Sequence, residues 1–176
     1  MCRLRMIEPD EANGPVKEIF KKLVLVPNVL CLMANSNSVL DTYAHHHANL
    51  SEYKLSGRYR KMISLAVSQF NACSYCIALH TAGAVDGGIL TEEECIESRR
   101  MESSDPRAGA LLRFTKEVLE KRGNIDENTL ASIKSQGFDD REVVEAIAVI
   151  SFITLANYTA NVGKPLIDFR VPPPLC

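Results

Sequence analysis

The sequence predicts an all-α protein. Apolar residues recur three and four positions apart, helix-capping residues precede these segments, and no stretch alternates polar and apolar residues between turn residues as a strand would. The chain of 176 residues is 46% hydrophobic and 24% charged, which is the size and balance of one ordinary globular domain. We therefore expect a single helical domain over residues 1–176, with an extended proline-rich tail from about residue 171.

Prolines and a serine divide the N-terminal part of the chain into helices. Pro15 can occupy the first turn of a helix that runs to about Val24, because its missing N–H is not needed there. Pro27 then breaks the chain, and Ser56 is a plausible N-cap for the helix that leads to a cysteine pair. The predicted helices cover residues 15–24, a short segment from about residue 28, and residues 38–53 and 57–70.

Capping patterns define the later helices. Thr91 and Glu94 have the spacing of a capping box, in which each side chain binds a backbone N–H of the other residue. Asp105 is placed to cap a further helix, and Asp139 or Asp140 to cap the last one. The predicted helices cover residues 73–84, 91–101, 106–123, 126–137 and 141–161.

The last predicted helix is apolar nearly all round. A helix that packs against one neighbour needs apolar residues on one side only. We therefore expect this helix to lie at the centre of the core or to be shared with another subunit. Its apolar residues include Val143, Val144, Ile147, Ile150, Phe152, Ile153 and Leu155.

The net charge and the length of the apolar runs argue against nucleic acid and membrane as partners. The net charge is −2 and no block of Lys or Arg is longer than a pair, so we expect no nucleic-acid binding. The apolar run over residues 143–156 contains Glu145 and is shorter than the roughly 20 residues of a membrane span, so we expect no membrane helix. The N-terminus lacks the apolar segment of a signal peptide, and the expected location is a reducing cytoplasm.

Two of the six cysteines form a motif. Cys73 and Cys76 have the Cys-x-x-Cys spacing, whereas the other four are scattered along the chain. We interpret Cys31 as a small buried hydrophobic residue and expect Cys176, at the end of the tail, to be exposed. The scattered cysteines are Cys2, Cys31, Cys95 and Cys176.

The Cys-x-x-Cys pair predicts thiol redox chemistry. Its cysteines lie one helical turn apart and can form a disulfide, and a helix that begins near Cys73 stabilises a thiolate through its free N–H groups and dipole. His80 lies four residues after Cys76, so within a helix it can exchange a proton with that thiol. The sulfurs carry both electrons, so no bound cofactor is expected. The alternatives are a chance pair and a zinc-binding or interaction module in which Cys73, Cys76 and His80 hold the metal.

The helix before the pair carries a polar stripe. Lys61, Ser64, Ser68 and Asn71 recur at spacings of three, four and three, which places them on one face. This stripe is either a solvated face or, if the chain reverses at Asn71 and Ala72, the lining of the thiol site.

The motif Asn71-x-Cys73-x-Tyr75-Cys76-x-x-x-His80, within the segment from Leu55 to Ala84, resembles the core motif of a known superfamily. This is the superfamily of AhpD-like alkylhydroperoxidases and carboxymuconolactone decarboxylases, in particular its peroxidase-related branch. The resemblance continues in Val26-Pro27-Asn28-Val29-Leu30 and in Gly137-Phe138-x-Asp140-x-Glu142, and so covers most of the chain.

The resemblance implies an activity and a role for each site residue. It assigns peroxide reduction to Cys76, the resolving and partner-facing role to Cys73, and part of a proton relay to His80. Helix electrostatics instead favour Cys73 as the more acidic thiol. The resemblance also implies a homo-oligomer (dimer, trimer or hexamer) that acts on peroxide or disulfide substrates with electrons from a thiol donor. Lactone decarboxylation is a third activity, but that branch generally lacks the Cys-x-x-Cys pair.

This sequence departs from the family pattern at Lys61. The relay glutamate of the family lies twelve positions before the first cysteine, where this chain has Lys61. A charged ammonium cannot accept a proton, but a positive charge within about 4–6 Å of a thiol favours its thiolate. We expect the lysine to weaken peroxidase activity more than thiol-disulfide exchange.

His45, His46 and His47 form a second histidine cluster. Neighbouring residues in a helix are about 100° apart, so the three cannot bind one metal from a regular helix. We interpret them as surface or subunit-contact residues. The alternative is that one of them approaches the thiol site and replaces the missing carboxylate.

Overall fold

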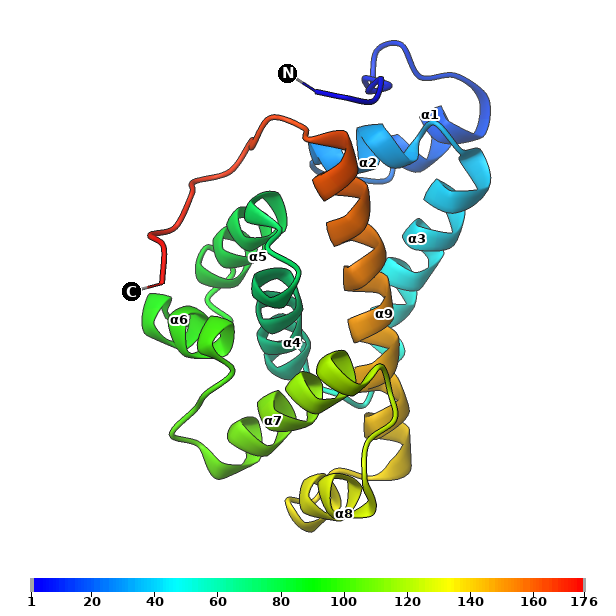
Figure 1. Cartoon of the computed structure of the whole chain (residues 1–176). Helices are drawn as coiled ribbons and strands as arrows, with labels where there is room; N and C mark the ends of the chain where they lie inside the picture. Colours follow the sequence, from blue (N-terminus) through cyan, green and yellow to red (C-terminus); the bar gives the residue numbers. More distant parts are fainter. Residues whose placement is uncertain (1, 176) are drawn as a thin grey trace.

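The computed structural model describes residues 2–175 and confirms an all-α fold (Figure 1). These residues form nine α-helices and one short 3-10 helix, and none of them lies in a strand. Cys176, which we expected to be exposed, lies outside the described residues. The elements are α1 (Gly14–Phe20), α2 (Asn28–Met33), α3 (Asn37–Asn49), η1 (Leu50–Glu52), α4 (Gly57–Phe70), α5 (Ser74–Val85), α6 (Glu92–Arg100), α7 (Pro106–Lys121), α8 (Glu127–Ser135) and α9 (Asp140–Gly163).

The predicted helix starts agree with the caps in the structure. The Ser56 side chain accepts a hydrogen bond from the N–H three residues later, at the start of α4. Thr91 and Glu94 form the expected capping box of α6, and Asp139 forms a second one with Glu142 at α9. These side chains satisfy N–H groups that the first turn of a helix leaves unbonded.

Several helix ends differ from the prediction. α1 ends at Phe20 rather than Val24, because the following residues form turns in which Val24 is fully exposed and gains nothing from packing. α3 gives way to the 3-10 helix η1 before its predicted end. α9 runs on to Gly163 and ends where Lys164 adopts a left-handed conformation.

α4 lies at the centre of the molecule and packs against α5, α6, α7 and α9 (Figure 1). Its apolar residues are buried in two separate clusters. Ile63 and Val67 pack with residues of α7 and α9, whereas Met62 and Leu65 pack with residues of α6 and α7. Because α4 is enclosed in this way, its polar side chains must find partners inside the protein.

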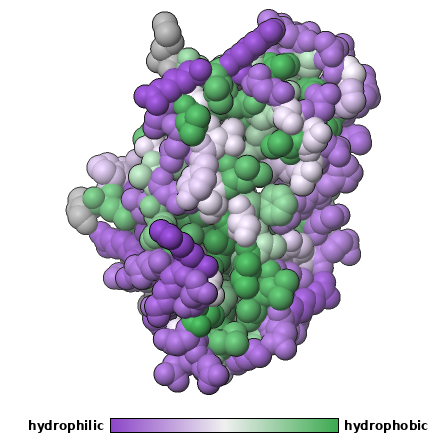
Figure 2. Space-filling view, turned by 45° about the vertical axis from the view of Figure 1, so that its right-hand side comes forward, coloured by the Kyte–Doolittle hydropathy of each residue, from purple (hydrophilic) through white to green (hydrophobic). Residues whose placement is uncertain are grey.

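α9 is a core helix that also exposes an apolar strip. It contacts α2, α4, α5 and α7, as expected for a central helix. By length and composition it could cross a membrane, contrary to our expectation, but half of its most apolar segment is buried in the protein. Figure 2 shows a band of apolar surface on the side that carries α3 and α9. The exposed apolar residues of α9 are Val144, Ile147, Leu155, Tyr158 and Val162.

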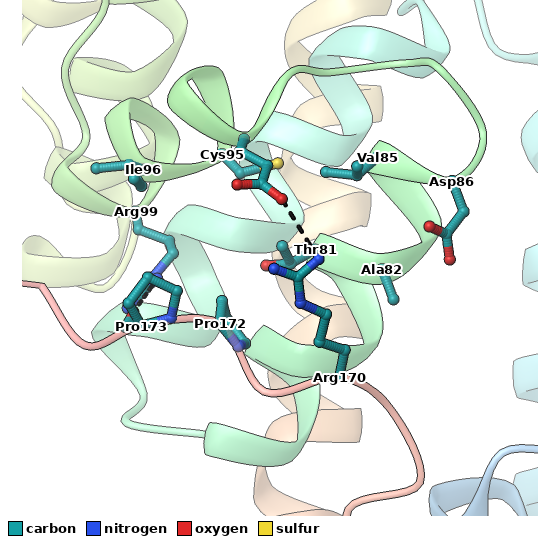
Figure 3. A pocket seen from close by; sticks show the side chains of 11 residues that line it. Thr81, Ala82, Val85, Asp86, Cys95, Ile96, Arg99, Arg170, Pro172 and Pro173 are labelled. Atoms are coloured by element: carbon teal, nitrogen blue, oxygen red, sulfur yellow. Dashed lines mark hydrogen bonds and ion pairs between the residues drawn. The ribbon is translucent and has the colours of Figure 1, made fainter.

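The extended tail lies across α5 and α6 (Figure 3). Arg99 on α6 is buried and donates hydrogen bonds to the Gln69 side chain (3.0 Å) and to the Pro173 carbonyl (2.9 Å). Arg170 forms an ion pair with Glu92 at an N–O distance of 3.5 Å. The tail and the helices beneath it enclose a hollow of about 90 Å³. These contacts anchor the tail to the helical body.

Arg99→Ala should lower the free energy of unfolding by about 2 kcal/mol, because it leaves the Gln69 and Pro173 acceptors without a charged donor. Urea unfolding followed by circular dichroism measures the change. Arg100→Ala is the matched control, since Arg100 is the next residue of α6 and is exposed. Equal stability of the two variants would contradict an anchoring role for Arg99.

Candidate active site

A tight reversal between α4 and α5 positions the cysteine pair. Ala72 adopts a left-handed conformation with a φ of 49°, and the Cys73 N–H donates to the Ser68 carbonyl at 2.9 Å. α5 begins at the next residue, with Cys73 as its N-cap. Asn71 and Ala72 therefore join two packed helices, and Cys73 lies at the start of a helix rather than within one.

The two thiols share a hydrogen bond that makes them unequal. Both side chains are buried free cysteines, and the Cys73 sulfur accepts the Cys76 N–H at 3.3 Å. A hydrogen bond from the Cys76 thiol lowers the pKa of Cys73 against the effect of burial, and backbone N–H groups and the Lys164 charge add to the lowering. The same thiol bond and burial raise the pKa of Cys76. Cys73 is therefore the more acidic thiol, and Cys76 holds the shared proton.

A buried amide from α9 holds this arrangement in place. Asn157 is fully buried; its Nδ2 donates to Ser68 Oγ at 3.2 Å, and its Oδ1 accepts from Asn71 Nδ2 at 3.0 Å. A hydrogen bond with Asn157 also lowers the pKa of Cys76, against the larger effects of Cys73 and burial. The sequence analysis missed Asn157, although an amide among the apolar residues of a helix is itself a signal for a buried polar contact.

The polar stripe of α4 faces the interior. Ser68 is fully buried and Ser64 nearly so, which excludes a solvated face. Ser68 and Asn71 contact Asn157 beside the thiols, whereas Lys61 and Ser64 line a cavity. One face of α4 therefore serves both the cysteine pair and this cavity.

The cavity lies between α3, α4, α5 and α9 and has a volume of about 370 Å³. Lys61 and His80, both predicted site residues, meet there with His46 and His47 from α3. His47 fits the alternative in which one member of the histidine cluster reaches the site. His45 instead is exposed and contacts the Asp41 carboxylate of its own helix at 3.3 Å.

His80 is held in the neutral form. It is 9% exposed, and its Nε2 has no hydrogen-bond partner among residues 2–175. Burial, together with the charges of Lys61 and His47, lowers the pKa of His80 to about 3. Burial likewise lowers the pKa of Lys61. Lys61 thus acts on the histidines of the cavity, whereas the lysine charge that favours the Cys73 thiolate is that of Lys164.

The described part of the chain offers no zinc site. Within residues 2–175, no three His, Cys, Asp or Glu side chains are grouped so that they could hold a metal ion. Cys73 and Cys76 hydrogen-bond to one another, and His80 lines the cavity. The geometry therefore gives no support to the zinc-binding alternative.

Comparisons with known proteins agree with the sequence motif. The model of the carboxymuconolactone decarboxylase family matches residues 38–117, and no curated protein matches the chain. A peroxidase-related protein from Silicibacter sp. TM1040 is 28% identical with a TM-score of 0.75, and the match covers 90% of this chain and 85% of that one. The alkylhydroperoxidase AhpD core of a peroxidase-related protein from Ralstonia eutropha JMP134 is 25% identical with a TM-score of 0.70, over 93% and 86% of the two chains.

A more distant structure shares the same fold. The debrominase Bmp8 has a TM-score of 0.75 over 96% of this chain and 92% of its own, but at 14% identity the likeness concerns the fold alone. The family match and the two peroxidase-related structures lead to one assignment. Both support the superfamily of AhpD-like alkylhydroperoxidases and carboxymuconolactone decarboxylases for this chain.

Proposed function

We propose that the protein is a thiol-dependent oxidoreductase, a peroxidase or disulfide reductase, in which Cys73 and Cys76 cycle between dithiol and disulfide. The observation that carries this proposal is the pairing of an acidic Cys73 at a helix N-terminus with a proton-holding Cys76. Such a pair can give up two electrons and two protons without a cofactor. The peroxidase-related relatives support the same type of role.

In the peroxide reaction, a thiolate sulfur attacks one peroxide oxygen and the O–O bond breaks, which leaves a sulfenic acid and an alcohol. The second thiol then attacks the sulfenic sulfur, forms the disulfide and releases water. A thiol donor returns two electrons and restores the dithiol. By resemblance to the family, we assign the attack to Cys76, resolution to Cys73 and acceptance of the Cys76 proton to His80.

Disulfide reduction uses the pair in the opposite order. The Cys73 thiolate attacks the substrate disulfide and forms a mixed disulfide, and Cys76 then attacks the Cys73 sulfur and releases the reduced substrate. This order starts from the thiol that is already acidic. Peroxide attack by Cys76 instead needs His80 to accept a proton, and a pKa of about 3 makes His80 a weak base. We therefore propose that disulfide reduction is the stronger of the two activities.

Mild oxidation should remove two titratable thiols and leave a chain lighter by two hydrogens. Cys73→Ser should abolish both changes, because it removes one thiol of the proposed pair. Thiol titration and mass spectrometry of the intact chain measure them. Cys95→Ser is the control, since Cys95 is a buried free thiol outside the pair. A Cys73→Ser protein that still loses two thiols would show that another pair cycles.

Lys61→Glu should raise the pKa of His80, because the Lys61 charge lowers it in the natural protein. With a stronger base and an accepting carboxylate beside it, peroxide turnover should rise about tenfold or more. An NMR titration of the His80 ring and a peroxide-consumption assay with dithiothreitol measure the two effects.

Lys61→Met is the matched control, because it removes the charge without supplying a carboxylate. It should raise the pKa of His80 less and leave peroxide turnover well below that of Lys61→Glu. If the two variants consumed peroxide at the same rate, a proton relay through residue 61 would be ruled out.

We further propose that the protein forms a homo-oligomer through the exposed apolar strip of α9. A large exposed apolar surface is typical of a protein–protein contact, and symmetric assembly of identical chains is the commonest way to cover one. The five exposed apolar residues of α9 span most of its length, so a partner can cover the whole helix.

Light scattering should therefore give a mass above the 19.5 kDa of one chain. Leu155→Glu should reduce that mass, because it places a charge within the apolar strip. Asn124→Glu is the control, since Asn124 is exposed and lies outside α9. A monomeric natural protein would contradict this proposal without affecting the thiol cycle.

A further inference from the structure

We propose that the cavity between α3, α4, α5 and α9 is a binding site for a small organic anion, a carboxylate attached to an apolar body. This inference rests on the lining of the cavity and not on the thiol cycle.

The first observation is uncompensated positive charge. Arg60 and Lys61 line the cavity, and the residues that line it include no Asp or Glu. Among residues 2–175, neither side chain has a carboxylate oxygen within 4.0 Å. One nitrogen of the Arg60 guanidinium donates a hydrogen bond to the Leu55 carbonyl at 2.7 Å. Two cations held partly out of water without a counter-ion are costly, and a bound anion would offset that cost.

The Glu145 carboxylate, which acts on Arg60, is already engaged by other donors. Glu145 influences Arg60 but does not line the cavity. Its oxygens accept from the backbone N–H groups of Lys54 (3.1 Å) and Leu55 (2.7 Å) and from Arg141 Nε (2.8 Å). A carboxylate in this position cannot also serve as the counter-ion of Lys61.

The second observation is a buried polar atom without a partner. His80 lines the cavity, is more than nine-tenths buried, and leaves its Nε2 unbonded among the described residues. Buried polar atoms nearly always have a hydrogen-bond partner, so this one marks a position for a ligand atom. The neutral imidazole can donate an N–H from Nε2 to a carboxylate oxygen.

The ammonium of Lys61 lies close to the same helix. A Cβ built at Gly83 would stand 3.1 Å from Lys61 Nζ, so the missing side chain leaves room for the ammonium against α5, one turn after His80. A donor from Lys61 and a donor from His80 can therefore converge on one ligand group. Convergent donors of this kind orient a ligand within a largely apolar pocket.

The remaining residues that line the cavity indicate that the body of the ligand is apolar. Leu50, Val149, Phe152 and Ile153 contribute apolar wall, and one face of the Phe152 ring is covered by His46 at a centroid distance of 3.4 Å. The volume of about 370 Å³ falls in the usual range of small-molecule sites, roughly 300–1,000 Å³. An inorganic anion would leave this apolar wall uncovered. A medium-chain carboxylate would contact both the positively charged side chains and the apolar wall.

Octanoate is a suitable probe. 1-Octanol is the control that has the apolar chain without the charge, and inorganic phosphate is the control that has negative charge without an apolar chain. Isothermal titration calorimetry on the reduced full chain should show octanoate binding at least about tenfold more tightly than either. NMR should show that octanoate, and not octanol, shifts the His80 ring resonances. No redox step occurs in this experiment, so its outcome is independent of the proposed enzyme activity.

Lys61→Met should weaken octanoate binding by about tenfold or more, and Arg60→Met provides a second removal of charge at the same site. Lys116→Met is the matched control, since Lys116 is an exposed lysine outside the cavity. Equal binding of octanoate and octanol, or octanoate binding that survives both Lys61→Met and Arg60→Met, would overturn the proposal. If phosphate bound as tightly as octanoate, the claim that the ligand has an apolar body would be overturned.

Discussion

The hydrogen bonds of the buried Asn157 amide determine the geometry on which the candidate site depends. Through this amide α9 binds Ser68 near the end of α4 and Asn71 in the turn that follows. The Ser68 carbonyl in turn receives the Cys73 N–H. Loss of the amide would leave the fully buried Ser68 hydroxyl without its Asn157 donor, at a cost of about 1–3 kcal/mol. It would also remove the partner of the half-buried Asn71 amide. The position of Cys73 thus depends on a residue far away in the sequence.

α5 carries two groups with opposite electrostatic environments. At its first turn, free N–H groups and the Cys76 thiol favour a negative charge on Cys73. Farther along, burial and neighbouring positive charge disfavour a proton on His80. The helix therefore combines an acidic thiol with a neutral imidazole. Such a combination supports thiolate chemistry without a strong general base, which is the reason for placing disulfide reduction ahead of peroxide reduction.

Lys61 connects the redox chemistry with the cavity. By the resemblance, the family has a proton-relaying glutamate at this position, whereas this chain has the half-buried positive charge of Lys61. The consequences are a less basic His80 and a cavity with two cations and no lining carboxylate. Both follow from the same burial, because removal from water penalises protonated imidazole and also strengthens the attraction for an anion.

Local sequence patterns were enough to predict the helical fold, the helix caps and the Cys-x-x-Cys motif. Ser56, Thr91 and Asp139 act on N–H groups within four residues, so local spacing was enough to predict them. The end of α1 and the exposed strip of α9 were decided by packing, which local spacing does not encode. The same holds for the partners of the site, because Asn157 and Phe152 reach it only when α9 packs beside α4 and α3.

The choice between a solvated face and the lining of the thiol site for the polar stripe likewise required the tertiary structure. Its spacing placed Lys61, Ser64, Ser68 and Asn71 on one face, but a face is solvated or buried according to what covers it. His47 is a second example, since only the tertiary structure brings it into the same cavity as Lys61. Local sequence specifies backbone hydrogen bonds between near neighbours. Burial, and with it the pKa values of His80 and Cys73, depends on residues that are distant along the chain.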